Sequence, residues 1–204
     1  MRIHSKDIGG LTVSEVLVTS GILLMLFAAI TAIYVSSSRV WRKVDLRTSL
    51  LRELTAAVRH LERDLEVTHP HGIARADNAC AYLSATNDDW RPTVGPDGRL
   101  NWQKYVIVFV DPEGRLRRRI LPLGTPSVRP PSFREETSYA LKDYLSGPLD
   151  NDRYLTHSGK VTRFELANAG HYGSLYELSI EGEQPKNSTE VEKLEIRTKV
   201  SVRF

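Results

Sequence analysis

The chain has little cysteine and no recognisable catalytic pattern. Its 204 residues include one cysteine, Cys80, which cannot form an intramolecular disulfide, so packing alone must hold the fold together. We predict Cys80 to be a small core residue in a strand and not a reactive thiol. No nucleophile elbow, phosphate-cradling glycine loop, zinc-binding helix or Ser-His-Asp order occurs in the sequence. We therefore predict a protein that is not an enzyme and needs no cofactor.

Metal ligands are also sparse. His69 and His71 flank a proline and cannot lie on one helical face, so we predict no metal site there. Four oxygen-bearing residues cluster near position 150, but their spacing matches no calcium loop and no glutamate closes the set. We favour a solvated turn, with a calcium site as the alternative, for Asp143, Asp150, Asn151 and Asp152.

Neither sign of charge is in large excess, because the formal net charge is only +3. The densest basic group is Arg115, Arg117, Arg118 and Arg119, and a strand there would place Arg115, Arg117 and Arg119 on one face. Such a patch could attract nucleic acid, but no stacking platform accompanies it. We expect these arginines to form salt bridges with an acidic neighbouring subunit, and we expect no nucleic-acid partner.

What the sequence does contain is a long uncharged run near its start. Residues 16–38 carry no charge, and at about 1.5 Å per residue a helix of that length crosses a hydrocarbon core of about 30 Å. Arg2 and Lys6 precede the run, which favours a cytoplasmic N-terminus and an exported body. A single acid, Glu15, stands at its beginning. A carboxylate there either pairs with another chain or sits at the headgroup boundary.

The leader before this run does not fit a secretory signal peptide. Gly9 and Gly10 precede the apolar segment instead of following it, and the segment is too long. Gly10, an apolar residue, Thr12, Val13 and then Glu15 resemble the processing site of type IV prepilins and type II secretion pseudopilins. Leu11 and Ser14 depart from the commonest residues of that site and no proline interrupts the run, which favours the minor pseudopilins over the major pilins. An unprocessed signal anchor is the alternative.

The resemblance implies specific roles for three residues. A prepilin peptidase would cut between Gly10 and Leu11 and methylate the new amine of Leu11. Glu15 would pair with the free amine of a neighbouring subunit in an assembled filament, fixing the axial register. The partners implied are the prepilin peptidase, other major and minor pseudopilins and the inner-membrane assembly platform.

The helix is predicted to continue beyond the apolar run. No glycine or proline interrupts residues 22–69, and Pro70 is a helix stop. Apolar residues recur with heptad spacing, which suits packing on a sheet or on other helices, with a free-standing coiled coil as the competing interpretation. One row is Val44, Leu51, Val58 and Leu65, and the adjacent row is Val40, Leu54 and Leu61. The end of the helix, with its Arg-Asp-Leu run at residues 63–65, resembles minor pseudopilin J and the PilW-like minor pilins.

The remainder reads as β-rich. Continuous β-branched and aromatic residues predict a strand over 105–110, followed by a turn at 111–114 and a returning strand over 115–121. A short apolar stretch covers 79–85, and a short helix is predicted over 139–145. Further strands are predicted over 161–166, 175–181 and 191–204, the last with one buried and one wet face. Loops are predicted over 87–101, 124–132 and 146–159.

Together these features predict an α+β, pilin-like fold in four parts: a leader at 1–10, a transmembrane half-helix at 11–38, an amphipathic half-helix at 39–69 and an exported β-rich domain at 70–204. The expected function is that of a minor pseudopilin of a type II secretion system. The chain would span the inner membrane once, with its C-terminal domain in the periplasm. The alternatives are a minor type IV pilin for pilus priming, DNA uptake or adhesion, and an unprocessed signal-anchored binding domain.

Overall fold

The structure is a computed structural model that describes residues 12–87, 91–133, 140–145, 152–157, 160–170, 174–185 and 191–202, except the side chains of Lys43 and Leu46. The chain divides into two compact units, residues 1–45 and residues 46–204. The first unit contains the start of α1, and the second contains the rest of that helix and all the strands.

Helix α1 spans Val13–Glu66, 54 residues, as the uninterrupted sequence between Gly21 and Pro70 predicts. It ends at Glu66, three residues before the predicted boundary at residue 69. Pro70 instead begins a short 3-10 turn, η1 (Pro70–Gly72), where its missing backbone donor is tolerated. Pro70 therefore follows the stop and does not make it.

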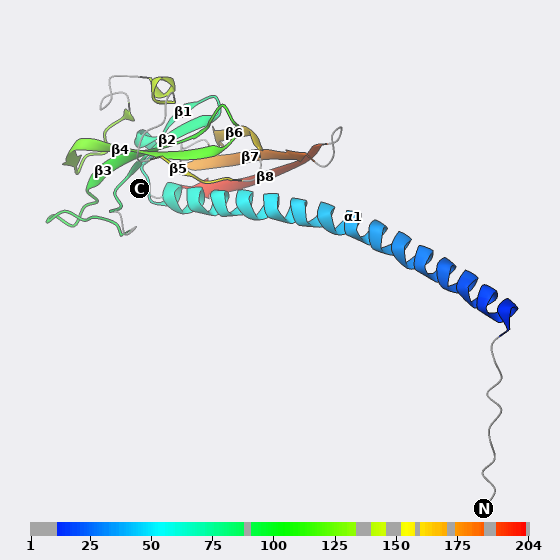
Figure 1. Ribbon diagram of the computed structural model, residues 1–204. Helices are drawn as coiled ribbons and strands as arrows, with labels where there is room; N and C mark the ends of the chain where they lie inside the picture. The colour runs from blue at the N-terminus through cyan, green and yellow to red at the C-terminus, as the bar shows by residue number, and fades with distance from the viewer. Residues whose placement is uncertain are drawn as a thin grey trace, which may run out of the picture. The chain divides into compact units, whose positions relative to one another are not determined.

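The body has a five-stranded antiparallel sheet in which the strands follow one another in sequence order (Figure 1). Its strands are β1 (Ala74–Ala76), β2 (Ala79–Ser84), β3 (Trp102–Val110), β4 (Leu116–Ser127) and β5 (Arg153–Tyr154). The predicted hairpin is confirmed, since Val110 pairs with Leu116 across the turn at 111–114. Gly114 has a φ of 80°, the left-handed conformation that a tight turn of this kind requires.

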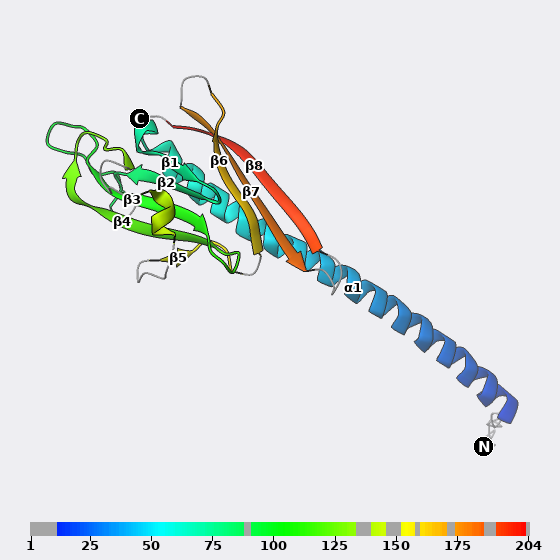
Figure 2. The same cartoon turned by 90° about the horizontal axis from the view of Figure 1, so that it is seen from above.

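The second sheet has three antiparallel strands, β6 (Lys160–Asn168), β7 (Leu175–Pro185) and β8 (Val191–Ser201), again in sequence order. Along β8 exposed and half-buried residues alternate, as the sequence predicts for a strand with one wet face. The register is continuous from the Leu175–Ser201 pair to the Pro185–Val191 pair. This sheet lies beside the five-stranded one in Figure 2.

One face of the α1 segment in the second unit packs on both sheets. The buried helix residues meet strand residues such as Val108, Phe164 and Ile180 in one apolar core. The predicted heptad rows are confirmed for four residues, because Leu54, Val58, Leu61 and Leu65 are buried. They are wrong for Val40, Val44 and Leu51, which are exposed (Leu51 by 43%), and they omit the buried Leu50 and Ala57. A straight α-helix drifts by about 20° per heptad, so a stripe facing a sheet follows a period of 3.6. The stripe is Leu50, Leu54, Ala57, Val58, Leu61 and Leu65.

A second apolar core covers the opposite face of the five-stranded sheet. Tyr105, Ile107 and Phe109 of β3 pack there against Phe133 and Leu141. Strands β2 and β3 are therefore buried on both faces, which explains why their sequences are continuously apolar and do not alternate.

The predicted loops contain more order than the sequence indicates. Strand β4 runs to Ser127, so the first four residues of the predicted loop at 124–132 are extended and paired in part. Within the predicted loop at 146–159, Arg153 and Tyr154 form β5. The predicted short helix is present as a 3-10 helix, η2 (Leu141–Tyr144).

Candidate functional site

The beginning of α1 is a capping box formed by Thr12 and Glu15. The Glu15 amide donates to the Thr12 hydroxyl oxygen at 3.3 Å. In return, the Thr12 amide donates to Oε2 of Glu15 at 2.9 Å, and the Thr12 hydroxyl donates to the same oxygen at 2.9 Å. A negative charge in the first turn also interacts favourably with the helix dipole. The local sequence Thr-x-x-Glu therefore determines where the helix begins.

This contact gives the Glu15 carboxylate a partner within its own chain. From the sequence we expected its partner on another chain, and the contact with Thr12 was not predicted. The spacing of Thr12 and Glu15 is the capping-box signal that could have revealed it. Glu15 remains exposed at the helix end, so the cap leaves the carboxylate accessible. The two residues of the predicted cleavage site, Gly10 and Leu11, lie outside the described residues.

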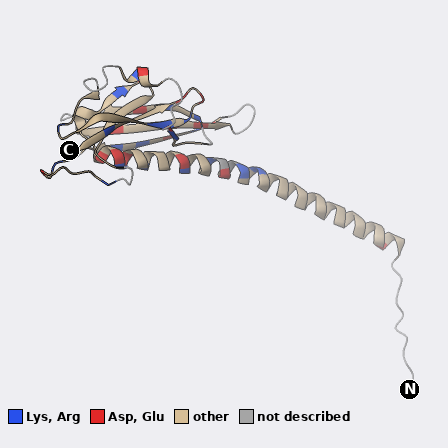
Figure 3. Ribbon diagram, turned by 60° about the vertical axis from the view of Figure 1, so that its left-hand side comes forward, with Lys and Arg blue, Asp and Glu red and all other residues tan. Residues whose placement is uncertain are grey.

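The apolar run after Glu15 forms an uncharged helical segment whose side chains are exposed. Charged residues are absent from the α1 segment that follows Glu15, until Arg39 (Figure 3). Its large side chains are exposed on all sides, Met25 by 77% and Ile33 by 69%. Helix α1 is long and apolar enough to cross a membrane, and it is the one such helix among the described residues. The segment fits a membrane anchor or a signal sequence.

The two threonines inside this run form hydrogen bonds within the helix itself. The Thr19 hydroxyl donates to the Glu15 carbonyl at 2.7 Å, and the Thr31 hydroxyl donates to the Phe27 carbonyl at 2.7 Å. Such bonds to the carbonyl four residues earlier leave no hydroxyl donor directed at the surroundings. Both threonines are therefore compatible with an apolar environment.

The basic group of β4 does not form a free surface patch. Asp152 receives hydrogen bonds from Arg119 Nε at 2.8 Å and from Arg117 at 2.6 Å. A second Arg119 nitrogen reaches Asp152 at 2.8 Å, and a third donates to the Tyr144 carbonyl. Arg119 is only 2% exposed. The expectation that these arginines reach an acidic neighbouring subunit is wrong for Arg117 and Arg119, because the acid lies in the same chain.

The other two arginines of the group also have partners within the chain. Arg115 forms ion pairs with Asp111 at 3.0 Å and with Glu113 at 2.9 Å. Arg118 points to the helix side of the sheet and lies 3.5 Å from Asp64 of α1. Tyr82 donates its hydroxyl proton to that same carboxylate at 2.5 Å. Burial raises the pKa of Asp64, against the opposing effects of Tyr82 and Arg118.

The oxygen-bearing residues near position 150 do not behave as one turn. The side chain of Asp152 is 3% exposed, so the solvated-turn prediction is wrong for it. Asp143 accepts a hydrogen bond from the Ala140 amide at 3.0 Å and so caps η2. Asp150 and Asn151 lie outside the described residues. Among the residues that the structure describes, no group of three His, Cys, Asp or Glu side chains is arranged to hold a metal ion.

His69 and His71 contact each other just after the end of α1. Their rings stack at 5.3 Å, and the His71 amide donates to Nδ1 of His69 at 3.2 Å, which occupies one of the potential ligand atoms. Cys80 is fully buried in the core as predicted, and burial raises the pKa of its thiol to about 12. It is therefore protonated and unreactive.

The described residues thus place an accessible carboxylate, Glu15, at the start of an exposed apolar helix. In the body, the arginines at 115–119 pair with acids of the same chain. A long N-terminal apolar helix together with antiparallel sheet is a pilin-like architecture. The chain matches no family model, no curated protein and no solved structure.

Proposed function

We propose that this chain is a minor pseudopilin of a type II secretion system. In this proposal a prepilin peptidase cuts between Gly10 and Leu11, and α1 holds the subunit in the inner membrane until assembly. The subunit then enters a short periplasmic filament near its tip. The observation that carries the proposal is the exposed apolar part of α1 with Glu15 at its start.

The exposed apolar surface supports a role in assembly because water is an unfavourable environment for it. Each large aliphatic side chain moved from water into apolar surroundings contributes about 2 kcal/mol. Side chains such as Leu24, Phe27 and Ile30 are exposed around the whole circumference. Lipid satisfies such a helix before assembly, and packed helices of neighbouring subunits satisfy it afterwards.

Glu15 supports the proposal through its position. In the apolar interior of a filament an unpaired carboxylate would be costly, and the free amine of a neighbour's Leu11 would neutralise it. Only one axial placement of two subunits brings these groups together, so the pair would set the register. The capping box keeps the same carboxylate satisfied while the subunit is alone.

A minor type IV pilin is the nearest alternative, since the same helix chemistry would serve a pilus. The two are distinguished by deleting the gene in its host. Loss of exoprotein secretion with normal pili supports the proposal, and loss of pili with normal secretion supports the alternative.

Incorporation into filaments tests the proposal at Glu15. Glu15→Ala should remove the subunit from sheared filaments while the body stays folded. The matched control is Glu66→Ala, which removes an exposed acid at the other end of the same helix. Equal incorporation of both variants would contradict the proposed role of Glu15.

A further inference from the structure

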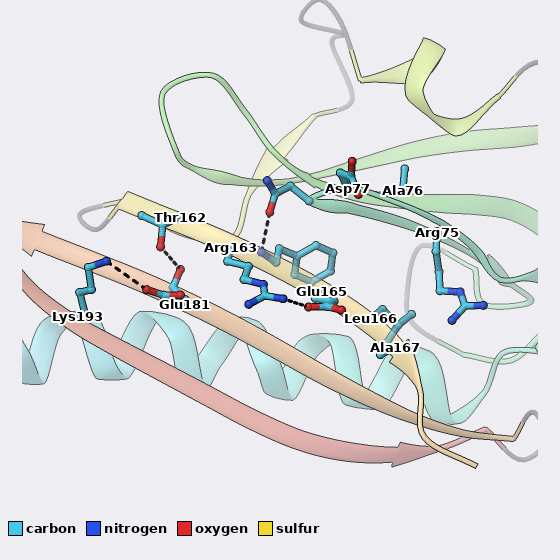
Figure 4. A pocket seen from close by; sticks show the side chains of 12 residues that line it. Arg75, Ala76, Asp77, Thr162, Arg163, Glu165, Leu166, Ala167, Glu181 and Lys193 are labelled. Atoms are coloured by element: carbon cyan, nitrogen blue, oxygen red, sulfur yellow. Dashed lines mark hydrogen bonds and ion pairs between the residues drawn. The ribbon is translucent and has the colours of Figure 1, made fainter. Parts of the chain in front are cut away.

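Two terminal strands of the body border a groove. Strand β1 is the last strand of the five-stranded sheet on one side, and β6 is the last strand of the three-stranded sheet. A groove of about 780 Å³ lies between the β1–β2 turn and β6 (Figure 4). Terminal strands carry backbone groups directed away from their own sheet, so this groove is bordered by hydrogen-bonding groups.

Asn78, in the turn between β1 and β2, makes the contact that closes one end. Its side-chain oxygen accepts a hydrogen bond from the Phe164 amide of β6 at 3.0 Å. Its own carbonyl accepts from the Val110 amide at 3.0 Å, and its φ of 55° gives it the left-handed conformation needed in the turn. The carboxamide of Asn78 thus occupies the place that a peptide carbonyl of an added strand would take.

The direction of the Phe164 amide determines what the rest of β6 offers. The backbone N–H and C=O groups of an antiparallel strand point alternately to its two neighbours. The Ala169 amide donates to the Leu175 carbonyl, so the backbone groups of residues at odd positions of β6 point to β7. The backbone groups of Phe164 therefore point to the groove, and so do those of Leu166, two residues further on. From Phe164 to Asn168 the strand rises by about 13 Å, at about 3.3 Å per residue, enough for four or five residues of an added strand.

Among the charged residues that line the groove, Arg75 and Asp77 form no ion pair within the described part of the chain, and Arg75 is the one that can pair with an acidic ligand. Arg163 pairs with Glu165 at 2.6 Å, and Lys193 pairs with Glu181 at 3.7 Å. Arg75, an exposed residue of β1, lines the opposite wall and forms no ion pair within the described part of the chain. Beside it the small side chains of Ala76 and Ala167 leave room for a backbone.

We propose that this groove binds an extended segment of a partner protein by strand addition to β6, with an acidic side chain of that segment paired with Arg75. Backbone bonds to β6 supply affinity, and the charge of Arg75 selects the sequence. The paired charges of Arg163 and Glu165 protect the same edge from indiscriminate pairing. The inference concerns the body alone and holds whether or not the leader is cleaved.

The test uses the full chain in detergent micelles and a fluorescent probe peptide, acetyl-Thr-Val-Glu-Val-Thr-amide. We expect saturable binding by fluorescence anisotropy and slower amide hydrogen exchange in β6. Arg75→Glu should weaken binding about fivefold, the upper range for one cross-strand charge pair. The matched control is Arg91→Glu, an exposed arginine away from the groove.

Two changes in the probe separate strand addition from simple charge attraction. A probe with lysine in place of its glutamate should bind the Arg75→Glu variant more tightly than the natural chain. Methylating all the backbone nitrogens of the probe should abolish binding, because alternate donors of an added strand face β6 and this change removes them whichever edge of the probe faces β6. Any one of three results would overturn the proposal. They are a lack of saturable binding, equal binding of the methylated and unmethylated probes, and equal effects of Arg75→Glu and Arg91→Glu.

Discussion

Thr12 donates both its backbone amide and its hydroxyl to one oxygen of Glu15, each at 2.9 Å. The carboxylate at the start of the apolar helix is therefore already bonded before any second subunit arrives. In the proposed assembly, Glu15 would exchange this intrachain cap for an interchain ion pair. Capping and charge pairing are separate properties of this residue, and variants can separate them.

Glu15→Gln keeps a side-chain oxygen for the cap but removes the charge. Loss of one member of a desolvated ion pair costs about 3–5 kcal/mol, so we expect incorporation into filaments to fall on the order of 100-fold or more. Thr12→Val removes the hydroxyl and keeps the charge, and it should leave incorporation within a few-fold of normal. Immunoblots of sheared filaments measure both. A larger defect for Thr12→Val than for Glu15→Gln would assign the role to the cap instead.

Asp152→Asn should destabilise the body strongly. The variant leaves the buried guanidinium groups of Arg117 and Arg119 without their negative partner, at a cost of about 3–5 kcal/mol in the free energy of unfolding. Glu113→Gln is the control, because its ion pair with Arg115 is exposed and contributes less than about 1 kcal/mol. Urea unfolding of the full chain in micelles, followed by tryptophan fluorescence, measures both changes. Similar losses in the free energy of unfolding for the two variants would contradict the stabilising role of the ion pairs at Asp152.

Asp64 should make stability fall as pH rises. Burial raises its pKa in the folded state above the ordinary 3.8, so the folded chain binds a proton more tightly than the unfolded chain. The stabilisation is present below the unfolded pKa and is lost as pH rises through the folded pKa. Asp64→Asn should lack this component, and the difference between the two unfolding free energies should change with pH in that window. A constant difference would show that the carboxyl titrates alike in both states.

Gly72→Ala tests the close approach between η1 and β2. A Cβ at Gly72 would lie 2.5 Å from the Cβ of Leu83, so the backbone would have to shift. We expect a loss of about 1–3 kcal/mol in the free energy of unfolding, typical of overpacking. Gly124→Ala is the control, since nothing lies within 4 Å of the added atom. A neutral Gly72→Ala would mean that the turn sits further from β2 than described.

Much of the fold could be predicted because local patterns decide it. The absence of glycine and proline over 22–69 predicted one long helix, and the run at 105–110 predicted the central strand β3. The turn at 111–114 was recognisable from its proline and glycine. These signals depend on neighbouring residues only, so no tertiary information was needed.

The errors arose where distant residues meet. Whether Leu51 or Leu50 faces the core depends on how the helix lies on the sheets, which a heptad count cannot give. The partner of Arg119 is 33 positions away, in a stretch whose composition indicated only a loop. The contact between Asn78 and Phe164 spans 86 positions and has no sequence signal at all. The Thr12–Glu15 cap, by contrast, was visible in the sequence and was overlooked.

The central claim is that α1 belongs to a processed pilin-type subunit, and the N-terminus of the native protein tests it most directly. Mass spectrometry of the chain purified from host membranes should find Leu11 as the first residue, with a methyl group on its amine. Replacing Gly10 by a bulky residue should preserve residues 1–10 on the purified chain. An intact leader on the natural protein, with Met1 or Arg2 first, would contradict the account and leave an unprocessed signal anchor.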